Sequence, residues 1–208
     1  FAVLAADKVL ADCDVDAADL HLVLSPEVVE RHSFVGGQTA SIDAGVCTGC
    51  GRCAEACRYG AVRTPPGNGG TREIDPLACE GCGVCALVCP VGAAGLEDTV
   101  NGEWFVSRTA YGTLVHARLG IAEENSGKLA TLVRREARER GEEEGASLLI
   151  VDGPPGIGCP VIASMTGADA ALIVTEPSLS GLHDLRRIAG VAGRLGVPTA
   201  VAVNKWDL

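Results

Sequence analysis

The sequence predicts an α/β protein with a mostly parallel sheet, interrupted by a smaller α+β insert. Short continuous apolar runs alternate with amphipathic helical segments, the pattern of parallel α/β sheets. Eight of the ten cysteines lie between Cys47 and Cys89, in two similar runs. We therefore expect residues 1–37 and 99–208 to form one α/β domain, and residues 38–98 to form the insert.

The part before the insert holds a strand and a helix. Lys8–Asp14 is a short apolar run that ends in carboxylates, which predicts a strand with Asp12 and Asp14 at its carboxyl end. Ala17–Leu24 reads as a short helix, and Glu27–Ser41 alternates weakly like a strand. The two carboxylates could position a metal ion and an attacking water beside a phosphate, or simply cap the helix.

The insert repeats one cysteine pattern. Cys47–Cys57 and Cys79–Cys89 each read C-x2-C-x2-C-x3-C, the spacing of two-cluster bacterial ferredoxins. Thiolates are soft ligands that suit iron, and in this pattern the fourth cysteine of each run binds the cluster of the other run. We expect two [4Fe–4S] clusters. The ligands of the first would be Cys47, Cys50, Cys53 and Cys89. The ligands of the second would be Cys57, Cys79, Cys82 and Cys85.

Zinc and disulfides are the alternatives for these cysteines. A zinc site takes four ligands in two pairs, whereas each run here carries four, and disulfides need an oxidising compartment. The two runs differ at one point, because Pro90 follows Cys89 but Arg58 follows Cys57. The glycines that would let backbone N–H groups approach the sulfurs are Gly49, Gly51, Gly81 and Gly83.

The part after the insert alternates strands and helices. Alternating residues predict a first strand, helical spacing of apolar residues predicts two helices, and continuous apolar runs predict buried parallel strands. In chain order these are strand Glu103–Arg108, helix Leu129–Ala137, strands Ser147–Asp152 and Ala170–Thr175, helix Gly181–Leu195 and strand Thr199–Val203.

Asp152 ends one of these strands and precedes a Gly/Pro loop. The carboxyl end of a buried strand is where α/β sheets bind ligands, and an aspartate there can hold Mg²⁺ through water. Such a loop can also respond to a γ-phosphate as a switch. A capping aspartate in an ordinary turn explains the same residues equally well. The candidate nucleotide contacts in the loop are Gly153, Pro154 and Gly156.

Asn204 and Asp207 follow the last strand and could hydrogen-bond a purine base, although a plain turn explains them as well. No G-x-x-x-x-G-K-[ST] run occurs in the chain. The chain starts without Met and stops directly after a strand-like run, so we expect a piece of a longer protein whose phosphate loop precedes Phe1. Cys13 and Cys159 lie outside the cysteine runs and are expected to pack as small thiols.

Composition excludes several functions. The chain has 208 residues, 47% of them hydrophobic, so it can bury a core. Its net charge of −10 and lack of a basic stripe argue against nucleic acid as a partner. No apolar run is long enough for a membrane span. Free thiols at cluster spacing favour a reducing compartment, so we expect a cytoplasmic protein.

These motifs together resemble the MinD/ParA-type P-loop ATPases that carry an inserted two-cluster ferredoxin domain. The resemblance rests on the double cysteine run and on four flanking segments. These are Asp12–Asp16, Glu124–Leu129, Asp152–Pro160 and Asn204-Lys205. It implies a doubly wound, mostly parallel P-loop NTPase-type sheet around the insert.

The same resemblance implies an ATPase that binds ATP and Mg²⁺ and forms a homodimer. Asp12 would position the attacking water, Asp152 would hold the metal, and Asn204 would contact the base. The deviant Walker A segment of the family would precede Phe1. We expect hydrolysis to be linked to electron transfer to a redox partner protein. The alternatives are an iron–sulfur carrier whose clusters are cargo, and a ferredoxin-type carrier without ATPase activity.

Overall fold

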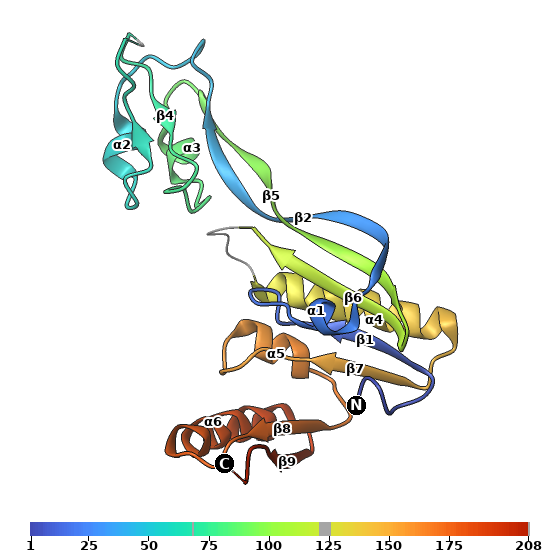
Figure 1. The fold of residues 1–208 in the computed structure, drawn as a ribbon. Helices are drawn as coiled ribbons and strands as arrows, with labels where there is room; N and C mark the ends of the chain where they lie inside the picture. The colour runs from blue at the N-terminus through green and yellow to red at the C-terminus, as the bar shows by residue number, and fades with distance from the viewer. Residues whose placement is uncertain (68, 121–125, 208) are drawn as a thin grey trace. The chain divides into compact units, whose positions relative to one another are not determined.

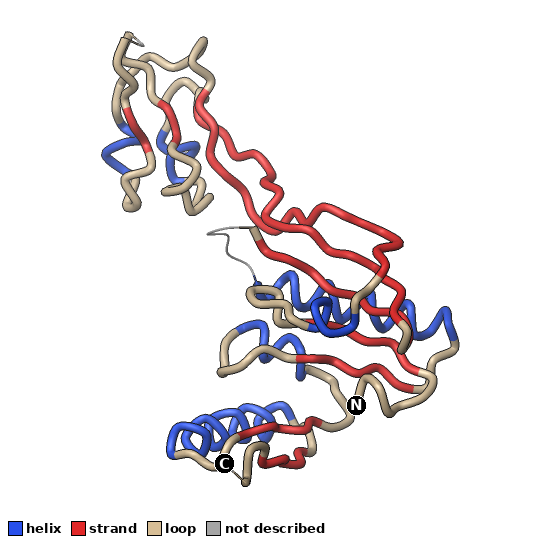
Figure 2. The backbone as a smooth tube through the Cα atoms, viewed as in Figure 1, coloured by secondary structure: helices blue, strands red, loops and turns tan. Residues whose placement is uncertain are grey.

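The computed structural model describes residues 1–67, 69–120 and 126–207. Helices and strands alternate along most of the chain (Figures 1 and 2). In chain order the elements are β1 (Lys8–Asp12), α1 (Leu20–Leu24), β2 (Glu27–Ile42), α2 (Arg52–Ala56), β3 (Val62–Arg63), β4 (Glu73–Ile74), α3 (Val84–Val88), β5 (Ala94–Thr109), β6 (Gly112–Leu119), α4 (Ser126–Glu144), β7 (Leu148–Asp152), α5 (Cys159–Met165), β8 (Ala171–Thr175), α6 (Leu179–Leu195) and β9 (Thr199–Val203).

The chain divides into two compact units. Unit 1 comprises Phe1–Phe34, Gly102–Gly120 and the described residues from 126 onward, and unit 2 comprises Val35–Asn101. The long strands β2 and β5 each contribute residues to both units. The carboxylates singled out in the sequence belong to unit 1, and the two cysteine runs belong to unit 2.

Unit 1 is built on a five-stranded sheet in the order β2-β5-β6-β1-β7. Strand β1 is parallel to both β6 and β7, whereas β5 and β6 are antiparallel. The central sheet is therefore mixed, and the expectation of a mostly parallel sheet is wrong for it. The reason is a tight turn after Thr109, where Gly112 has a φ of 124° and Thr109 Oγ1 donates to the Gly112 carbonyl at 2.7 Å. This turn makes β5 and β6 a hairpin.

Strand β1 is buried along its whole length because both faces of the sheet are covered there. Val9 and Ala11 pack toward Leu129 and Val133 of α4. Leu10 packs on the opposite face with Leu24 of α1 and with Leu114 of β6. Because side chains alternate along a strand, Asp12 lies on the same face as Leu10, next to α1. The continuous apolar run in the sequence reflects this two-sided burial.

Strands β8 and β9 form a separate parallel pair. Helix α6 packs on β8, and its Ala192 shares a small apolar cluster with Val161 and Met165 of α5. The Ser178 side chain caps α6 by accepting a hydrogen bond from the Gly181 N–H at 3.0 Å. The strands and α6 correspond to predicted segments, whereas α5 was not predicted. No helix in the described ranges is long and apolar enough to cross a membrane.

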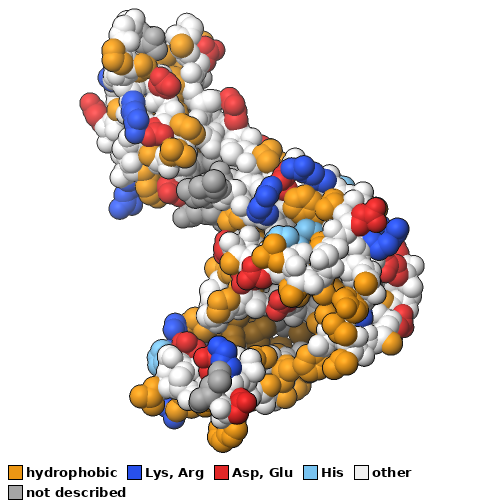
Figure 3. Space-filling model, in the orientation of Figure 1, with side chains coloured by type: hydrophobic (Ala, Val, Ile, Leu, Met, Phe, Trp, Pro, Cys, Tyr) orange, Lys and Arg blue, Asp and Glu red, His pale blue; other side chains and the backbone are white. Residues whose placement is uncertain are grey.

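Apolar side chains remain exposed around β7, β8 and β9. Leu148 of β7 is 46% exposed, Val174 of β8 is 62% exposed and Val201 of β9 is 49% exposed. Figure 3 shows apolar side chains gathered over this part of unit 1, where this face is hollowed. Within the described residues, β7 pairs with β1 on one edge only, and β8 pairs with β9.

Unit 2 repeats one local structure. Helices α2 and α3 pack against each other beside the small antiparallel hairpin β3–β4. Each helix begins after a left-handed glycine, Gly51 with φ 84° or Gly83 with φ 74°. Each ends at an extended cysteine, Cys57 with φ −76° and ψ 109°, or Cys89 with φ −74° and ψ 113°. The sequence repeat is thus also a backbone repeat.

Candidate iron–sulfur and carboxylate sites

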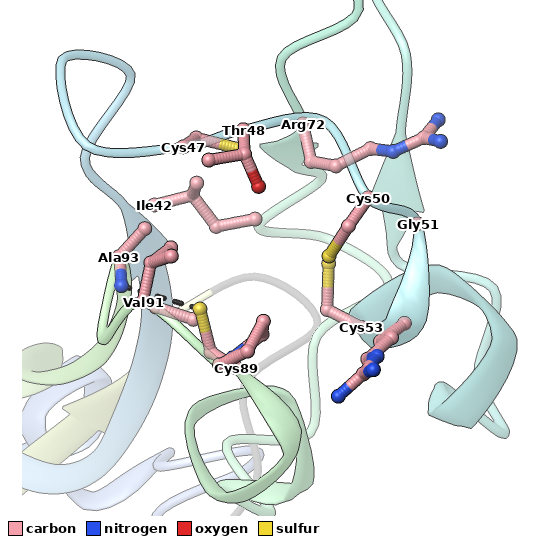
Figure 4. Close-up of a pocket in the computed structure, with 13 residues that line it drawn as sticks. Ile42, Cys47, Thr48, Cys50, Gly51, Cys53, Arg72, Cys89, Val91 and Ala93 are labelled. Atoms are coloured by element: carbon pink, nitrogen blue, oxygen red, sulfur yellow. Dashed lines mark hydrogen bonds between the residues drawn. The ribbon is translucent and has the colours of Figure 1, made fainter.

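The first pocket of unit 2 gathers four cysteines around a hollow of ≈ 310 Å³, part of it open to solvent. Three of them come from the first run, and the fourth is Cys89 from the end of the second run. Figure 4 shows the side chains of Cys47, Cys50 and Cys89 directed toward the hollow. Ile42, Val91 and Ala93 line the rest with apolar surface. The cysteines of this pocket are Cys47, Cys50, Cys53 and Cys89.

The second pocket has the complementary composition. It encloses a hollow of ≈ 330 Å³ that is also partly open to solvent. Its apolar lining includes Ala40, Tyr59 and Ile74, and Glu80 lies at its edge. The cysteines of this pocket are Cys57, Cys79, Cys82 and Cys85. The structure therefore brings together the two sets of four that the sequence pattern assigns to two clusters.

Backbone N–H groups surround the cysteine that each run contributes to the other pocket. Partial burial acts to raise the pKa of Cys57, but four following N–H groups, led by that of Ala61, outweigh it and lower the pKa. Similar N–H groups lower the pKa of Cys89. Burial instead raises the pKa of Cys53 and Cys85. These N–H groups thus favour the thiolate form of the two exchanged cysteines, which is the form that binds metal.

Glycine is required where each ligand loop approaches another backbone segment. A Cβ at Gly81 would lie 2.0 Å from the Gln38 carbonyl oxygen, and Gly81 has a φ of 61°. A Cβ at Gly49 would lie 2.6 Å from the Gly70 carbonyl oxygen, with a φ of 70°. Any side chain would push these contacts apart. Backbone N–H groups also reach sulfur in this unit, as at Cys89, whose Sγ accepts the Ala93 N–H at 3.2 Å.

The donors fit iron–sulfur clusters better than single metal ions. Within the described residues, no three His, Cys, Asp or Glu side chains converge closely enough to hold one ion. The thiols instead surround hollows, four to each. The Arg72 Nε–H is buried in the structure and has no hydrogen-bond partner among the described groups. Arg72 is also one of the residues that line the first pocket, and its guanidinium runs outward past Cys50 and Gly51 (Figure 4).

Three carboxylates gather at the carboxyl ends of two parallel strands in unit 1. Asp12 ends β1, Asp152 ends β7, and the two are register partners. Asp12 is fully buried and accepts the Asp14 N–H and the Leu20 N–H, each at 3.2 Å. Burial, with smaller contributions from the Asp152 and Asp14 charges, raises the pKa of Asp12 to about 6. The structure thus brings Asp152 to Asp12 and Asp14, from which it lies far away in the sequence.

The other two carboxylates also hold their protons more tightly than usual. Partial removal from water raises the pKa of Asp152, and the charges of Asp14 and Asp19 raise it further. Partial removal from water raises the pKa of Asp14 as well, together with the Asp16 and Asp19 charges. Concentrated negative charge of this kind attracts a cation. Among the described residues, however, no three carboxylate, His or Cys side chains converge closely enough to hold a metal ion directly.

The remaining nucleotide candidates lie in two places. Gly153, Pro154 and Gly156 follow β7 directly, beside Asp152, and Gly156 has a φ of 93°. Asn204 and Asp207 follow β9, in the separate two-stranded sheet, rather than β1 or β7. The expected base contacts therefore follow a different sheet from the carboxylates. Glu124 and Asn125, part of the resemblance to the ATPases, lie outside the described residues.

Sequence reasoning missed two polar features. Arg72 lines the first pocket although it precedes the second cysteine run, because β3 and β4 fold back as a hairpin. Ser107 and His116 form a buried pair across β5 and β6, with Oγ and Nε2 2.9 Å apart, and burial lowers the pKa of His116 to about 4. No motif marks these residues, because their positions depend on strand pairing.

Comparison with known proteins agrees with the geometry of unit 2. The family model of the 4Fe-4S dicluster domain (Fer4_7) matches residues 46–93, which contain all eight pocket cysteines. That domain is present in this chain, and it supports a function in iron–sulfur electron transfer. The match covers no part of the carboxylate site.

Two curated relatives come from Methanocaldococcus jannaschii. The uncharacterized protein MJ0578 is 32% identical over 197 residues, which are 95% of this chain and 67% of the relative. The uncharacterized protein MJ0579 is 28% identical over 107 residues, which are 51% of this chain and 38% of that relative. Both relatives thus extend beyond the part that this chain matches. The chain belongs to the family of MJ0578 and carries a 4Fe-4S dicluster domain within its α/β fold.

Proposed function

We propose that this protein transfers electrons through two [4Fe–4S] clusters and links that transfer to ATP hydrolysis in unit 1. The observation that carries the proposal is the division of eight cysteines into two pockets of four, each with one cysteine from the other run. A bound [4Fe–4S] cluster would supply one-electron storage at each pocket. The protein's own part is to present thiolates, exclude water with apolar side chains and place charge nearby.

The support for ATP hydrolysis is the carboxylate group at the ends of β1 and β7. Asp12, with a pKa of about 6, is suited to accept a proton from an attacking water near neutral pH. Asp152 would bind Mg²⁺ through water, and the loop from Gly153 to Gly158 would contact the γ-phosphate. Mg²⁺ would neutralise charge on the transferred phosphoryl group. Asn204 and Asp207 would contact the base from the end of β9.

The phosphate cradle would come from a segment before Phe1. Strand β7 has an unpaired edge within the described residues, and β8–β9 is a separate pair. A strand that carries the phosphate loop could pair with these edges and cover the exposed apolar side chains beside them. The relative MJ0578, of which this chain covers 67%, is long enough to supply such a segment. A homodimer, a cytoplasmic location and a redox partner protein complete the proposal.

The test uses the full-length protein, purified without oxygen. We expect about eight irons per chain and absorption near 400 nm, as two cubanes require. We also expect Mg²⁺-dependent ATP hydrolysis that is lost in Asp152→Asn but retained in Asp169→Asn, which alters an exposed carboxylate elsewhere in unit 1. Bound zinc in place of iron would refute the cluster assignment. Iron with no ATP binding or hydrolysis would leave a ferredoxin-type carrier.

One observation favours a second function, in which the clusters are cargo. Cys50 and Cys82 are exposed residues, so an acceptor protein could reach one ligand of each pocket. Incubation of the iron-loaded protein with an apo-acceptor distinguishes the two functions. Transfer of iron within minutes, with no reversible redox cycle, would favour the carrier. Stable clusters that cycle reversibly would favour electron transfer.

A further inference from the structure

The two cysteine pockets share one backbone design but differ in the charges around them. The first pocket is lined by two arginines, Arg52 and Arg72. The second pocket has no arginine or lysine in its described lining, and its charged residue is Glu80. The caps of α2 and α3 have nearly the same dihedral angles, so the backbone gives little reason for the two sites to differ. The side chains supply the asymmetry.

Arg72 is fixed beside the ligand loop of the first pocket. Its Nη2 donates to the Gly49 carbonyl oxygen at 3.4 Å, and its Nη1 donates to Thr64 Oγ1. A Cβ at position 51 would lie 3.1 Å from Nη2, so Gly51 allows this close approach. Figure 4 shows the Arg72 side chain running past the segment of Cys50 and Gly51. The guanidinium is therefore held at the loop that would bind the cluster.

The position of the Arg72 charge is what bears on reduction. The guanidinium is held at the Gly49 carbonyl of the ligand loop, and a positive charge close to a cluster makes the cluster easier to reduce. Glu80, by contrast, is an exposed residue whose charge is partly screened by water. Arg72 thus has the stronger influence of the two.

We propose that Arg72 makes the site of Cys47, Cys50, Cys53 and Cys89 the higher-potential site of the pair. Reduction adds one negative charge to a cluster, which a nearby guanidinium favours and a nearby carboxylate opposes. In the chain reduced by one electron, that electron therefore resides at the Arg72 site. Any electron placed on the Glu80 site passes to the Arg72 site, so one site is oxidised as the other is reduced. This inference rests on the proposed electron-transfer function.

Redox titration of the iron-loaded protein, reduced stepwise with dithionite and followed by electron paramagnetic resonance, tests it. In Arg72→Gln the higher midpoint should move to lower potential and the lower midpoint should stay in place. At the wild-type midpoint, the ratio of reduced to oxidised clusters should fall about tenfold, which is about 59 mV for a one-electron couple. Arg72→Lys keeps the charge and should restore most of the shift.

Two further variants complete the test. Arg63→Gln is the control, because it makes the same charge change at a residue of β3 that pairs with Asp75 and lines neither pocket. This variant should change both midpoint potentials very little. Glu80→Gln should raise the lower midpoint alone. Equal shifts in Arg72→Gln and Arg63→Gln, or no shift in Arg72→Gln, would overturn the inference. If Arg72→Gln does not retain its iron, the test rests on Glu80→Gln. A shift of both midpoints in Glu80→Gln, or of neither midpoint, would then overturn the inference. Failure to see two reversible transitions in the wild type would instead contradict electron transfer itself.

Discussion

Replacement of Asp12 by asparagine should change how the stability of unit 1 depends on pH. Asp12 is fully buried, and its folded-state pKa of about 6 lies above its ordinary value of 3.8. The folded state therefore binds the proton more tightly than the unfolded chain does. The contribution of Asp12 to stability is therefore greatest below about pH 4, the pKa of the group in the unfolded chain. This contribution decreases as the pH rises through about 6, the folded-state pKa, and is lost above it.

The size of the effect follows from the pKa difference. At about 1.4 kcal/mol per pKa unit, an ionised Asp12 costs the folded state about 3 kcal/mol at neutral pH. The asparagine of the Asp12→Asn variant carries no charge, but its amide has one acceptor oxygen where Asp12 accepts two backbone N–H groups. One N–H left without an acceptor costs about 1–3 kcal/mol. The balance of these two effects sets the pH-independent part of the difference in unfolding free energy between Asp12→Asn and wild type. The pH-dependent part of that difference follows from the charge of Asp12 alone.

The assay is urea unfolding followed by tryptophan fluorescence. Trp104 packs against the core of unit 1 and should supply most of the change, because Trp206 is already exposed in the folded protein. Between pH 4.5 and pH 8 the stability of Asp12→Asn relative to wild type should rise by about 2 kcal/mol. The control is Asp169→Asn, which makes the same chemical change at an exposed carboxylate. Its plot of unfolding free energy against pH should run parallel to that of the wild type. A parallel curve for Asp12→Asn would show that burial does not hold a proton on this carboxylate.

Three other changes have distinct expected outcomes. Gly81→Ala places a Cβ 2.0 Å from the Gln38 carbonyl oxygen, so the second pocket should lose its cluster and the iron content should fall to about four per chain. The control Gly190→Ala in α6 places a Cβ that meets no atom within 4 Å, so this variant should keep about eight irons per chain. Leu129→Ala removes a fully buried side chain from the core of unit 1 and should lower its free energy of unfolding by about 2–5 kcal/mol, as measured by urea unfolding followed by tryptophan fluorescence. A decrease of less than about 1 kcal/mol would contradict tight packing around Leu129. Burial raises the pKa of Cys13 to about 12, so iodoacetamide at pH 8 should modify Cys13 only after the protein unfolds. In the folded, iron-loaded protein the same reagent should modify exposed Cys159, which mass spectrometry of the peptides can check.

The sequence was most informative where one residue pattern determines one local structure. The spacing of the cysteines implied two interlocked sets, because a thiolate ligand can reach a cluster only from certain positions in the chain. Continuous apolar runs located β7, β8 and β9, since a strand buried on both faces needs apolar residues at every position. Asp12 and Asp152 could each be placed at a strand end for the same reason.

Other features depend on how segments pair, which no local pattern states. The β5–β6 hairpin was missed because β6 is only recognisable once the turn before Gly112 brings the two strands together. That omission is also why the sheet was expected to be mostly parallel. The neighbouring positions of Asp12 and Asp152 follow from the pairing of β1 with β7, and the approach of Arg72 to the first pocket follows from the β3–β4 hairpin.

The duplicated backbone of unit 2 gives the protein an internal comparison between its two sites. Gly51 and Gly83 start equivalent helices, and Cys57 and Cys89 end them with nearly the same dihedral angles. A doubled unit of this kind starts with two equivalent sites, and substitutions around either one can then change it without altering the shared scaffold. Arg72 and Glu80 are such differences. The two halves can therefore diverge in redox role while each still depends on the other for its fourth ligand.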